Sequence, residues 1–381
     1  MTNLISLELD YKIKVSSQVH DYLSPDNVYF PINKSSKIMI KDKEKILKGQ
    51  LILINGKEKI FSSVSGVIEG IKKTKINNED KTYLVIANDY KEKSVKKSIR
   101  KKFDIKSKEE LENILKEYGI NIKIDNKEIL LLNAIDSEPY LVNNTMYLLK
   151  NTNSVLESLD NLKNILDFKK VIILLKNTET EILNKINNIL GTYPDFKVIT
   201  VPNLYMIERK ENYQSYIDEL SNNIFDLSLK NYYKINEVLE KNKPITEKYI
   251  TITGDAIKNP LVINTKLGTK VSKIIDELIK LKKDKTGISY YYNGLMKGNK
   301  IDITDLVVDN DIEGLVITQG NQEKEQKCIK CGLCSKYCPL QISPIDNIGK
   351  EIKCLNCGLC TCVCPSNINF KTITKKDDKY E

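Results

Sequence analysis

All nine cysteines of this 381-residue chain lie between Cys328 and Cys364, and none occurs before them. They form two runs with the same spacing, C-x2-C-x2-C-x3-C-P, from Cys328 to Pro339 and from Cys354 to Pro365. Three cysteines at two-residue gaps sit on one tight loop and can ligate three corners of an iron–sulfur cubane. The fourth ligand cannot come from the same loop without strain, so two runs of this kind imply shared ligands.

The spacing is that of bacterial ferredoxins, in which each run lends its last cysteine to the other cluster. We therefore predict two [4Fe–4S] clusters, which carry single electrons and do not by themselves transform a substrate. Structural zinc is the alternative, but zinc prefers separated C-x2-C pairs and does not need the trailing prolines. The predicted ligands are Cys328, Cys331, Cys334 and Cys364 for one cluster, and Cys354, Cys357, Cys360 and Cys338 for the other.

Two further features of the runs concern single residues. Gly332 and Gly358 lie inside the loops, where a missing side chain lets backbone N–H groups approach inorganic sulfide. Cys362 falls outside the spacing. It is either a spare ligand or redox thiol, or a small buried hydrophobic residue, and we favour the buried residue.

The composition is that of a globular protein from a reducing compartment. Cysteines confined to one cluster do not form the framework of a secreted disulfide protein. Lys and Arg number 60 against 51 Asp and Glu, a formal charge of +9, but the charges are interleaved. This favours a solvated lysine-rich surface; an acidic partner or a membrane surface is the alternative, and no clustered basic face indicates nucleic acid. No apolar run reaches the 18 or so residues that span a bilayer, so we expect a cytoplasmic protein.

The pattern of elements predicts four units. Residues 1–95 are strand-rich with closely spaced glycines, which indicates a small β-sandwich or barrel. Residues 96–245 alternate strands such as "KEILLLNAI" and "KKVIILLKN" with helices such as "TEILNKINNIL", which predicts an open parallel α/β sheet. Residues 246–320 give strands and a helix in the order of a β-grasp module, and residues 321–381 hold the cysteine runs.

One helix of the α/β unit carries clear boundary signals. Ser107 and Glu110 form a capping box, in which each side chain reaches for the other's backbone amide. The helix "EELENILKEY" then ends at Gly119, the usual residue after a helix terminus.

Four sequence segments, in this order, resemble the RnfC family over nearly the whole chain. They are KGQ at 48–50 with SG at 65–66, N-x4-EPY at 133–140, "ITITGDAIKNP…LGT", and NGLMKG at 293–298, followed by the two cysteine runs. The resemblance implies an N-terminal barrel-sandwich hybrid, a Rossmann-like α/β domain, a β-grasp soluble-ligand-binding domain and a dicluster ferredoxin domain.

The resemblance also implies a setting. RnfC proteins are peripheral, cytoplasmic subunits of a membrane complex that pumps ions and transfers electrons. Redox partner proteins are therefore expected, with peripheral association on the inner face of the cell membrane through those partners. The α/β domain of the family is similar to the flavin-binding subunit of respiratory complex I.

This chain departs from that family at the flavin site. The family places the loop Gly-x-Gly-Gly-Ala-Gly-Phe-Pro-Thr between the capping-box helix and the EPY strand, where only Gly119 remains here. Bulky "INIKIDNKE" cannot approach a flavin phosphate closely, because a phosphate cradle needs successive glycine N–H groups. The family's Tyr-Pro-x-Gly-Gly-Glu motif is replaced by "VPNLYMIERKENYQ". We therefore expect FMN and NADH not to bind in the usual way.

Three polar residues of that site remain, namely Asn133, Asp136 and Glu138. In the family, carboxylates at this strand end lie near the flavin and the nucleotide, so these are the candidate residues of a diverged cofactor site. The alternative is that they only shape the exit from the strand.

The favoured function is a relay of single electrons through two [4Fe–4S] clusters between redox partners, in an ion-translocating or reductase-associated complex. One alternative is an FMN-dependent, NADH-oxidising subunit with a diverged flavin site. The other is a non-catalytic scaffold or wire subunit of a membrane redox complex. No residue is assigned a catalytic role.

Overall fold

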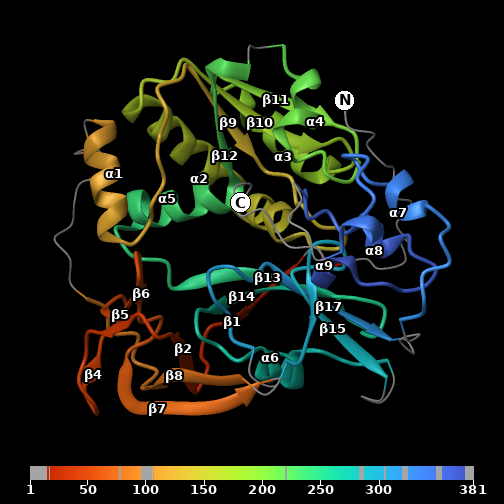
Figure 1. Cartoon of the computed structure of the whole chain (residues 1–381). Helices are drawn as coiled ribbons and strands as arrows, with labels where there is room; N and C mark the ends of the chain where they lie inside the picture. The colour runs from red at the N-terminus through yellow and green to blue at the C-terminus, as the bar shows by residue number, and fades with distance from the viewer. Residues whose placement is uncertain are drawn as a thin grey trace.

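The computed structural model describes residues 15–16, 18–76, 79–95, 105, 107–218, 221–282, 287–303, 306–319, 325–348 and 354–373. In the view of Figure 1, a parallel sheet with its helices lies above a six-stranded sheet, and two smaller antiparallel sheets lie below. The cysteine-rich segment lies at one side, next to both upper layers.

The α/β unit is built on four parallel strands in the order β11-β10-β9-β12. The expected parallel sheet is thus confirmed, although the pattern did not predict β12 or the helix after it. In this order, β10 and β11 lie on one side of β9, and β12 lies on the other side. In folds whose strand order reverses in this way, ligands bind beyond the carboxyl ends of the strands. The strands are β9 (Ile129–Asn133), β10 (Lys170–Lys176), β11 (Phe196–Val201) and β12 (Ile224–Ser228).

Helices cover both faces of this sheet, so its central strands are apolar on both sides. Leu130, Leu132 and Ile173 pack into one core, and Leu131 and Ile172 into the opposite one. The helices of this unit are α1 (Lys108–Glu117), α2 (Asn143–Ile165), α3 (Thr180–Leu190), α4 (Lys210–Tyr213) and α5 (Leu229–Lys241), with the short 3-10 turns η1 (Gln214–Tyr216) and η2 (Ser221–Asn223).

Helix α1 has the termini that the sequence predicts. The Ser107 hydroxyl accepts a hydrogen bond from the Glu110 amide over 3.2 Å. Gly119 follows the helix with φ +75°, a left-handed conformation that favours glycine, and its missing Cβ leaves room for Lys59 of the neighbouring strand β6.

The middle sheet has six strands in the order β1-β14-β13-β17-β15-β16. Its first strand comes from the N-terminal region, because β1 pairs in parallel with β14. The segment expected to belong wholly to a barrel therefore contributes a strand to the expected β-grasp unit. The elements are β1 (Val19–Tyr22), β13 (Glu247–Thr253), β14 (Leu261–Lys266), β15 (Ile288–Tyr292), β16 (Asn299–Ile301), β17 (Gly314–Gln319) and helix α6 (Val271–Leu278).

The remaining N-terminal strands form two antiparallel sheets, β2-β8-β7-β4 and β3-β5-β6. Gly66 of the SG turn is required there, because a Cβ at this position would lie 1.8 Å from the carbonyl oxygen of Ala87. The strands are β2 (Asn27–Ile32), β3 (Ser36–Ile38), β4 (Lys45–Ile46), β5 (Leu51–Asn55), β6 (Glu58–Phe61), β7 (Gly66–Ile76) and β8 (Glu79–Asn88).

These sheets and the six-stranded sheet share one hydrophobic core, which includes Val28 from β2 and Ile250 from β13. An ion cluster joins them as well. Lys48 of the KGQ turn contacts Glu92 at 2.6 Å and Glu247 at 3.1 Å, and buried Lys266 contacts the same two carboxylates. The two units are thus packed as one body rather than linked loosely.

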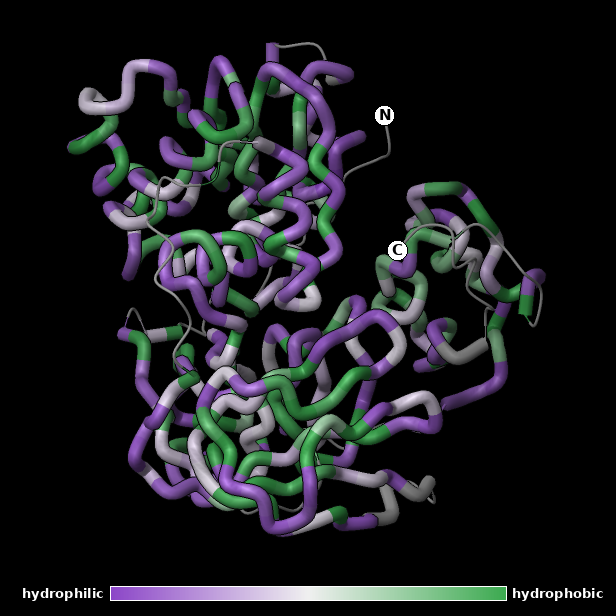
Figure 2. Tube along the Cα trace, turned by 90° about the vertical axis from the view of Figure 1, so that its left-hand side faces the viewer, coloured by the Kyte–Doolittle hydropathy of each residue, from purple (hydrophilic) through white to green (hydrophobic). Residues whose placement is uncertain are grey.

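The cysteine-rich segment forms a small lobe beside the main body (Figure 2). Its elements are α7 (Leu333–Lys336), η3 (Ile345–Asn347), α8 (Leu359–Cys362) and α9 (Phe370–Ile373). The predicted unit boundaries at residues 96 and 321 fall outside the described residues. Across the part of the chain that the structure describes, no helix is both long and apolar enough to cross a membrane.

Candidate functional site

The two cysteine loops have the same backbone conformation. Each passes twice through the left-handed region, at Lys330 and Gly332 with φ 57° and 75°, and at Asn356 and Gly358 with φ 50° and 74°. A short helix, α7 or α8, begins directly after each glycine. The sequence repeat is therefore a structural repeat.

Each loop turns a backbone N–H group towards its first cysteine. The Lys330 amide lies 3.3 Å from the Cys328 sulfur, and the Asn356 amide lies 3.3 Å from the Cys354 sulfur. Hydrogen bonds of this kind stabilise a thiolate, and they are among the features by which proteins tune metal-bound sulfur.

Each predicted set of four cysteines surrounds one cavity. The first cavity, of about 450 Å³, lies among the loop that begins at Cys328 and the end of the second run. The second, tighter at about 40 Å³, lies among the loop that begins at Cys354 and the end of the first run. The cysteines around the first are Cys328, Cys331, Cys334 and Cys364, and those around the second are Cys338, Cys354, Cys357 and Cys360.

The side chains that line each cavity offer four thiol groups as possible metal ligands. Within the described ranges, no three His, Cys, Asp or Glu side chains are close enough together to bind a single metal ion. A cubane places a separate iron under each thiolate, so its ligands stand farther apart than the four around one zinc. The all-thiolate sets fit the ligand chemistry of [4Fe–4S] clusters.

The prediction that Cys362 is buried is wrong. Its side chain is exposed at the end of α8. Leu359 and Phe370, each 2% exposed, are among the buried residues of this lobe.

The two loops differ in burial. Cys328 and Cys331 are exposed, whereas Cys357 is buried. A Cβ on Gly332 would meet nothing within 4 Å, while one on Gly358 would lie 1.8 Å from the Met296 carbonyl oxygen. We call the first the outer loop (328–334) and the second the inner loop (354–360).

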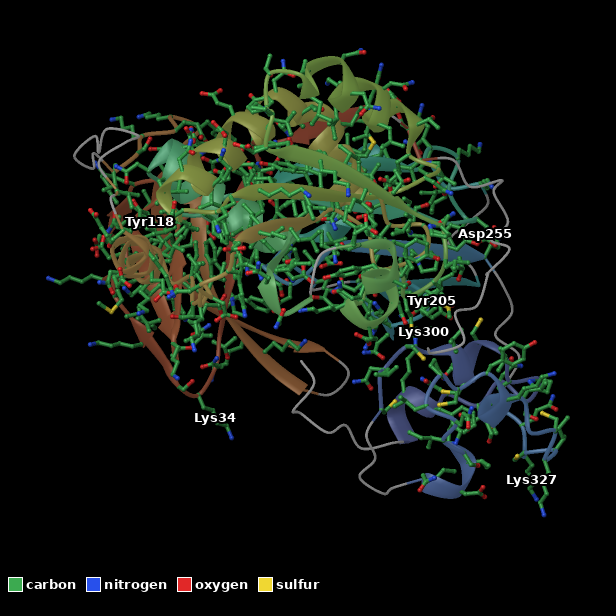
Figure 3. All side chains as sticks on the ribbon, turned by 90° about the horizontal axis from the view of Figure 1, so that it is seen from above. Lys34, Tyr118, Tyr205, Asp255, Lys300 and Lys327 are labelled. Atoms are coloured by element: carbon green, nitrogen blue, oxygen red, sulfur yellow. The ribbon has the colours of Figure 1, made fainter. Side chains whose placement is uncertain are left out.

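The inner loop is held by a segment that follows β11. The Tyr205 hydroxyl donates to the Cys357 carbonyl over 2.6 Å, and the Arg209 guanidinium donates to the Leu355 carbonyl over 2.8 Å. Figure 3 shows Tyr205 on the side of the main body that faces the sulfur-bearing lobe. The sequence alone did not identify these two residues. Their segment attracted attention only because the glycines of the family motif are absent from it.

The inner loop is also held by the NGLMKG turn of the six-stranded sheet. Lys371, just after the cysteine runs, donates to the carbonyls of Leu295 and Gly298 over 3.0 and 2.6 Å. Met296 packs in one apolar cluster with Tyr205, Met206, Cys357 and Leu359. Side chains from both neighbouring units thus exclude water from this side of the inner loop.

Glu138 holds that turn in place. Its carboxylate accepts hydrogen bonds from the amides of Met296 and Lys297, over 3.1 and 2.6 Å. Gly294 leaves room for it, since a Cβ there would lie 2.2 Å from a Glu138 oxygen. Glu138 is only 4% exposed, and this burial raises its pKa to about 7 although the two amides and Lys297 oppose the shift.

Asp136 and Asn133 are likewise engaged by the protein. Asp136 accepts hydrogen bonds from the Asn144 and Thr145 amides, over 2.9 and 3.1 Å, and so caps the N-terminus of α2. Burial raises its pKa to about 6, against the effect of these bonds. The Asn133 amide donates to the Glu208 carbonyl over 2.8 Å and fixes the loop after β11.

The space left at these strand ends is small. The cavity lined by Asp136, Glu138, Tyr205 and Met206 measures about 20 Å³, whereas small-molecule sites occupy roughly 300–1,000 Å³. The three residues of the expected flavin site do lie at one sheet edge, but their polar groups are used within the protein. This arrangement does not fit FMN.

A second, half-buried carboxyl group lies next to Asp136. The Thr145 hydroxyl lies 2.8 Å from Asp136 and 3.2 Å from Glu179. Burial and the Asp136 charge raise the pKa of Glu179 to about 7. Its Oε2 atom is buried and has no hydrogen-bond partner among the described residues.

Comparison with known proteins matches these features. The family described as the Nuo51 FMN-binding domain matches residues 116–215. The C subunit of the ion-translocating oxidoreductase complex of Buchnera aphidicola (Acyrthosiphon pisum strain) is 23% identical over 81% of this chain and 71% of its own length. The same component of the Haemophilus influenzae complex, from strain PittEE, is 23% identical over 83% and 54%.

Two further matches cover less. The C subunit of the proton-translocating ferredoxin:NAD(+) oxidoreductase complex of Clostridium ljungdahlii is 33% identical over 29% of this chain and 24% of its own length. A solved NAD+-reducing [NiFe]-hydrogenase is similar over 51% of this chain and 41% of its own, with 10% identity and a TM-score of 0.41. The structural likeness is too weak to define the fold.

The fold and site define a class: a mixed α/β protein of several packed units that ends in paired ferredoxin-type cysteine loops. Within that class, the chain is similar over about four fifths of its length to RnfC proteins, the C subunits of ion-translocating oxidoreductase complexes.

Proposed function

We propose that this protein relays single electrons between two redox proteins through two [4Fe–4S] clusters. The observation that carries the proposal is the arrangement of the eight cysteines. Four surround a cavity at the exposed outer loop, and four surround a cavity at the inner loop against the main body. A relay between two partners requires one cluster close to each partner. Here one cluster would lie at the solvent-exposed outer loop, and the other would lie at the inner loop against the main body.

The ligands would be drawn crosswise. Cys364 would complete the outer set and Cys338 the inner one, since each borders the cavity of the opposite loop. When bound, such clusters supply one-electron transfer at potentials set by hydrogen bonds and solvent exposure. The chain's own residues bind the cluster through thiolates and donate N–H groups to sulfur. On the inner side, Met206, Met296 and Leu359 exclude water.

The inner end of the relay would lie at the carboxyl edge of the parallel sheet. Tyr205 and Arg209 connect that edge to the inner loop through its backbone carbonyls. Asp136 and Glu138 then serve in shaping and fixing this junction, rather than in binding a flavin. No residue here is given a catalytic role.

The relatives suggest the partners. Their names describe the C subunits of ion-translocating and ferredoxin:NAD(+) oxidoreductase complexes. We propose that this chain too works beside other subunits of a redox complex, on the cytoplasmic face of the membrane and attached through those subunits. Nucleic acid is not among the proposed partners.

An NADH-oxidising flavoprotein remains the second candidate, because the family that matches residues 116–215 is described as FMN-binding. Against it stands the cavity of about 20 Å³ at the corresponding edge. FMN would require the loop that carries Tyr205 and Met206 to move away, which would break the bond from Tyr205 to Cys357.

Anaerobic purification with chemical analysis tests these proposals. We expect about eight irons and about eight sulfides per chain, a low-temperature paramagnetic signal after dithionite reduction, and no flavin released by acid. Zinc in place of iron, or no signal after reduction, would refute the relay. Stoichiometric released FMN would refute the proposed role of Asp136 and Glu138 and favour the flavoprotein.

A further inference from the structure

The outer loop and the residues on either side of it carry lysines without a carboxylate partner among the described residues. Lys327 and Lys330 flank Ile329, and all three side chains are exposed. Lys336 follows in α7, where its ammonium lies 5.9 Å from the ring centre of Tyr337. Within the described residues, none of these lysines pairs with a carboxylate. Glu325 and Asp346 are the only acidic residues among those described in this lobe, and the Ser343 hydroxyl bonds to Asp346 over 2.5 Å.

Apolar side chains are exposed on the same lobe. Ile329 is 64% exposed, the largest exposure among the large hydrophobic residues of the described chain, and it borders the cavity of the outer cysteines. Leu340 and Ile348 are 40% and 47% exposed. Of these, Ile329 lies between exposed lysines, and an apolar side chain beside charged ones is a usual feature of protein–protein interfaces.

The inner side offers no comparable surface. Arg209 and Lys371 donate to backbone carbonyls, and Lys297 pairs with Glu208 at 2.7 Å. Arg209 and Lys371 thus attach the lobe to the main body, and Lys297 is neutralised within the main body. Among the described residues of the lobe, the lysines without a carboxylate partner include Lys327, which Figure 3 shows at the far end of the lobe.

We propose that the outer loop is the docking surface for an acidic redox protein, which seats an apolar patch on Ile329 and carboxylates against Lys327 and Lys330. This inference rests on the proposed function, because it takes the outer cysteines to hold a cluster. In each encounter one electron passes between the docked protein and that cluster, so one is oxidised and the other reduced by a single electron. No bond is made or broken and no proton is needed.

The positive charge of this surface is the reason that we expect an acidic partner. Opposite charges on two surfaces steer the encounter and raise the association rate at low salt. Electron-transfer interfaces are among the small and weak ones, so we expect their formation to depend strongly on such steering. Binding should therefore fall steeply as salt is added, with a slope that depends on Lys327 and Lys330.

The test uses the full, cluster-loaded chain and an acidic [2Fe–2S] ferredoxin as the probe, with a basic c-type cytochrome for comparison. The double variant K327E/K330E reverses two charges at the outer loop. The matched control K34E/K37E makes the same change of net charge on exposed lysines around β3, far from the lobe (Figure 3). The measurements are the dissociation constant at low and high ionic strength, and the second-order rate of electron transfer.

At low salt we expect K327E/K330E to weaken ferredoxin binding about tenfold or more and to flatten its salt dependence, whereas K34E/K37E changes it less than about twofold. Ile329→Ser should weaken binding at high salt too, since it removes the apolar contact. Equal effects of the two double variants, or tighter binding of the basic cytochrome by the native chain, would overturn the docking surface.

Iron content and reduction by dithionite separate this proposal from the one on which it rests. Both double variants should keep the full iron content and the paramagnetic signal of the native chain. A native chain without clusters would refute the relay itself. Clusters that form and reduce normally, with ferredoxin binding indifferent to Lys327 and Lys330, would refute only the docking surface.

Discussion

The Tyr205 hydroxyl donates a hydrogen bond to the Cys357 carbonyl over 2.6 Å, so a side chain of the α/β unit is fixed to the backbone of the inner cysteine loop. Tyr205 is 8% exposed, and burial raises its pKa far above the usual value. The phenol therefore stays protonated and remains a donor at any pH the protein meets. This bond is a direct link between the sheet edge and the proposed inner cluster.

Replacing Tyr205 by phenylalanine tests that link. The variant keeps the ring in the apolar cluster with Met206 and Met296 but leaves the Cys357 carbonyl without this donor. Losing one partner of a buried hydrogen bond costs about 1–3 kcal/mol, and we expect this loss in the free energy of unfolding by denaturant. The reduction potential of the inner cluster should also change, because hydrogen bonding and solvent access around a cluster set it.

Tyr216→Phe is the matched control, since Tyr216 is 40% exposed on the same unit. Surface substitutions usually change stability by no more than about 0.5 kcal/mol. If Tyr205→Phe behaves like Tyr216→Phe in both stability and potential, the bond does not fix the inner loop.

The repeated glycines provide a second comparison. Gly332 and Gly358 have nearly the same φ, 75° and 74°, so alanine is strained equally at both, by about 1–2 kcal/mol. Only at Gly358 would the new Cβ also meet the Met296 carbonyl, at 1.8 Å. Gly358→Ala should therefore push the inner loop off the NGLMKG turn, whereas Gly332→Ala should leave it docked.

Amide hydrogen exchange of Met296 and Lys297 reports this undocking. We expect exchange at both amides to accelerate in Gly358→Ala and to stay native in Gly332→Ala, while denaturant unfolding shows the larger loss in Gly358→Ala. If the two variants lose the same stability and amide exchange does not change, the contact between Gly358 and Met296 does not hold the inner loop in place.

The features that the sequence predicted are those encoded in short stretches. The apolar strands β9 and β10, the cap at Ser107 and the glycine after α1 each depend on neighbours a few residues away. Local pattern and structure agree in these cases because no distant segment is needed to produce them.

The features that were missed depend on contacts between distant segments. Strand β1 pairs with β14, more than two hundred residues later, and nothing in its own sequence names that partner. Tyr205 and Arg209 gain their role only when the inner loop reaches them. The spacing of the cysteines likewise did not indicate that Cys362 is exposed, because burial depends on the packing of the whole lobe.

The variants Cys364→Ser and Cys362→Ser test which cysteines bind which cluster. Cys364 borders the cavity of the outer loop, whereas exposed Cys362, two residues earlier, borders neither cavity. We expect Cys364→Ser to lose the outer cluster, about half of the iron, and to keep the paramagnetic signal of the inner one. Cys362→Ser should retain all the iron. If Cys364→Ser instead abolished the inner signal, the assignment of ligands to the two cavities would be wrong.

Glu179 makes stability depend on pH in a predictable direction. Burial and the neighbouring Asp136 raise its pKa to about 7 in the folded protein, against about 4.3 in an unfolded chain. Between these values the folded state binds more protons, so the stability that this group contributes is complete below the unfolded pKa and is lost as pH rises through the folded one.

Glu179→Gln stays neutral, and we expect it to be about 1–3 kcal/mol more stable than the native chain at pH 8 and close to it near pH 5. The matched control variant is Glu181→Gln, at an exposed position in the first turn of the same helix. Anaerobic denaturant unfolding at several pH values between 5 and 8 measures both, and parallel curves for Glu179→Gln and the native chain would show that Glu179 is already ionised in the folded protein.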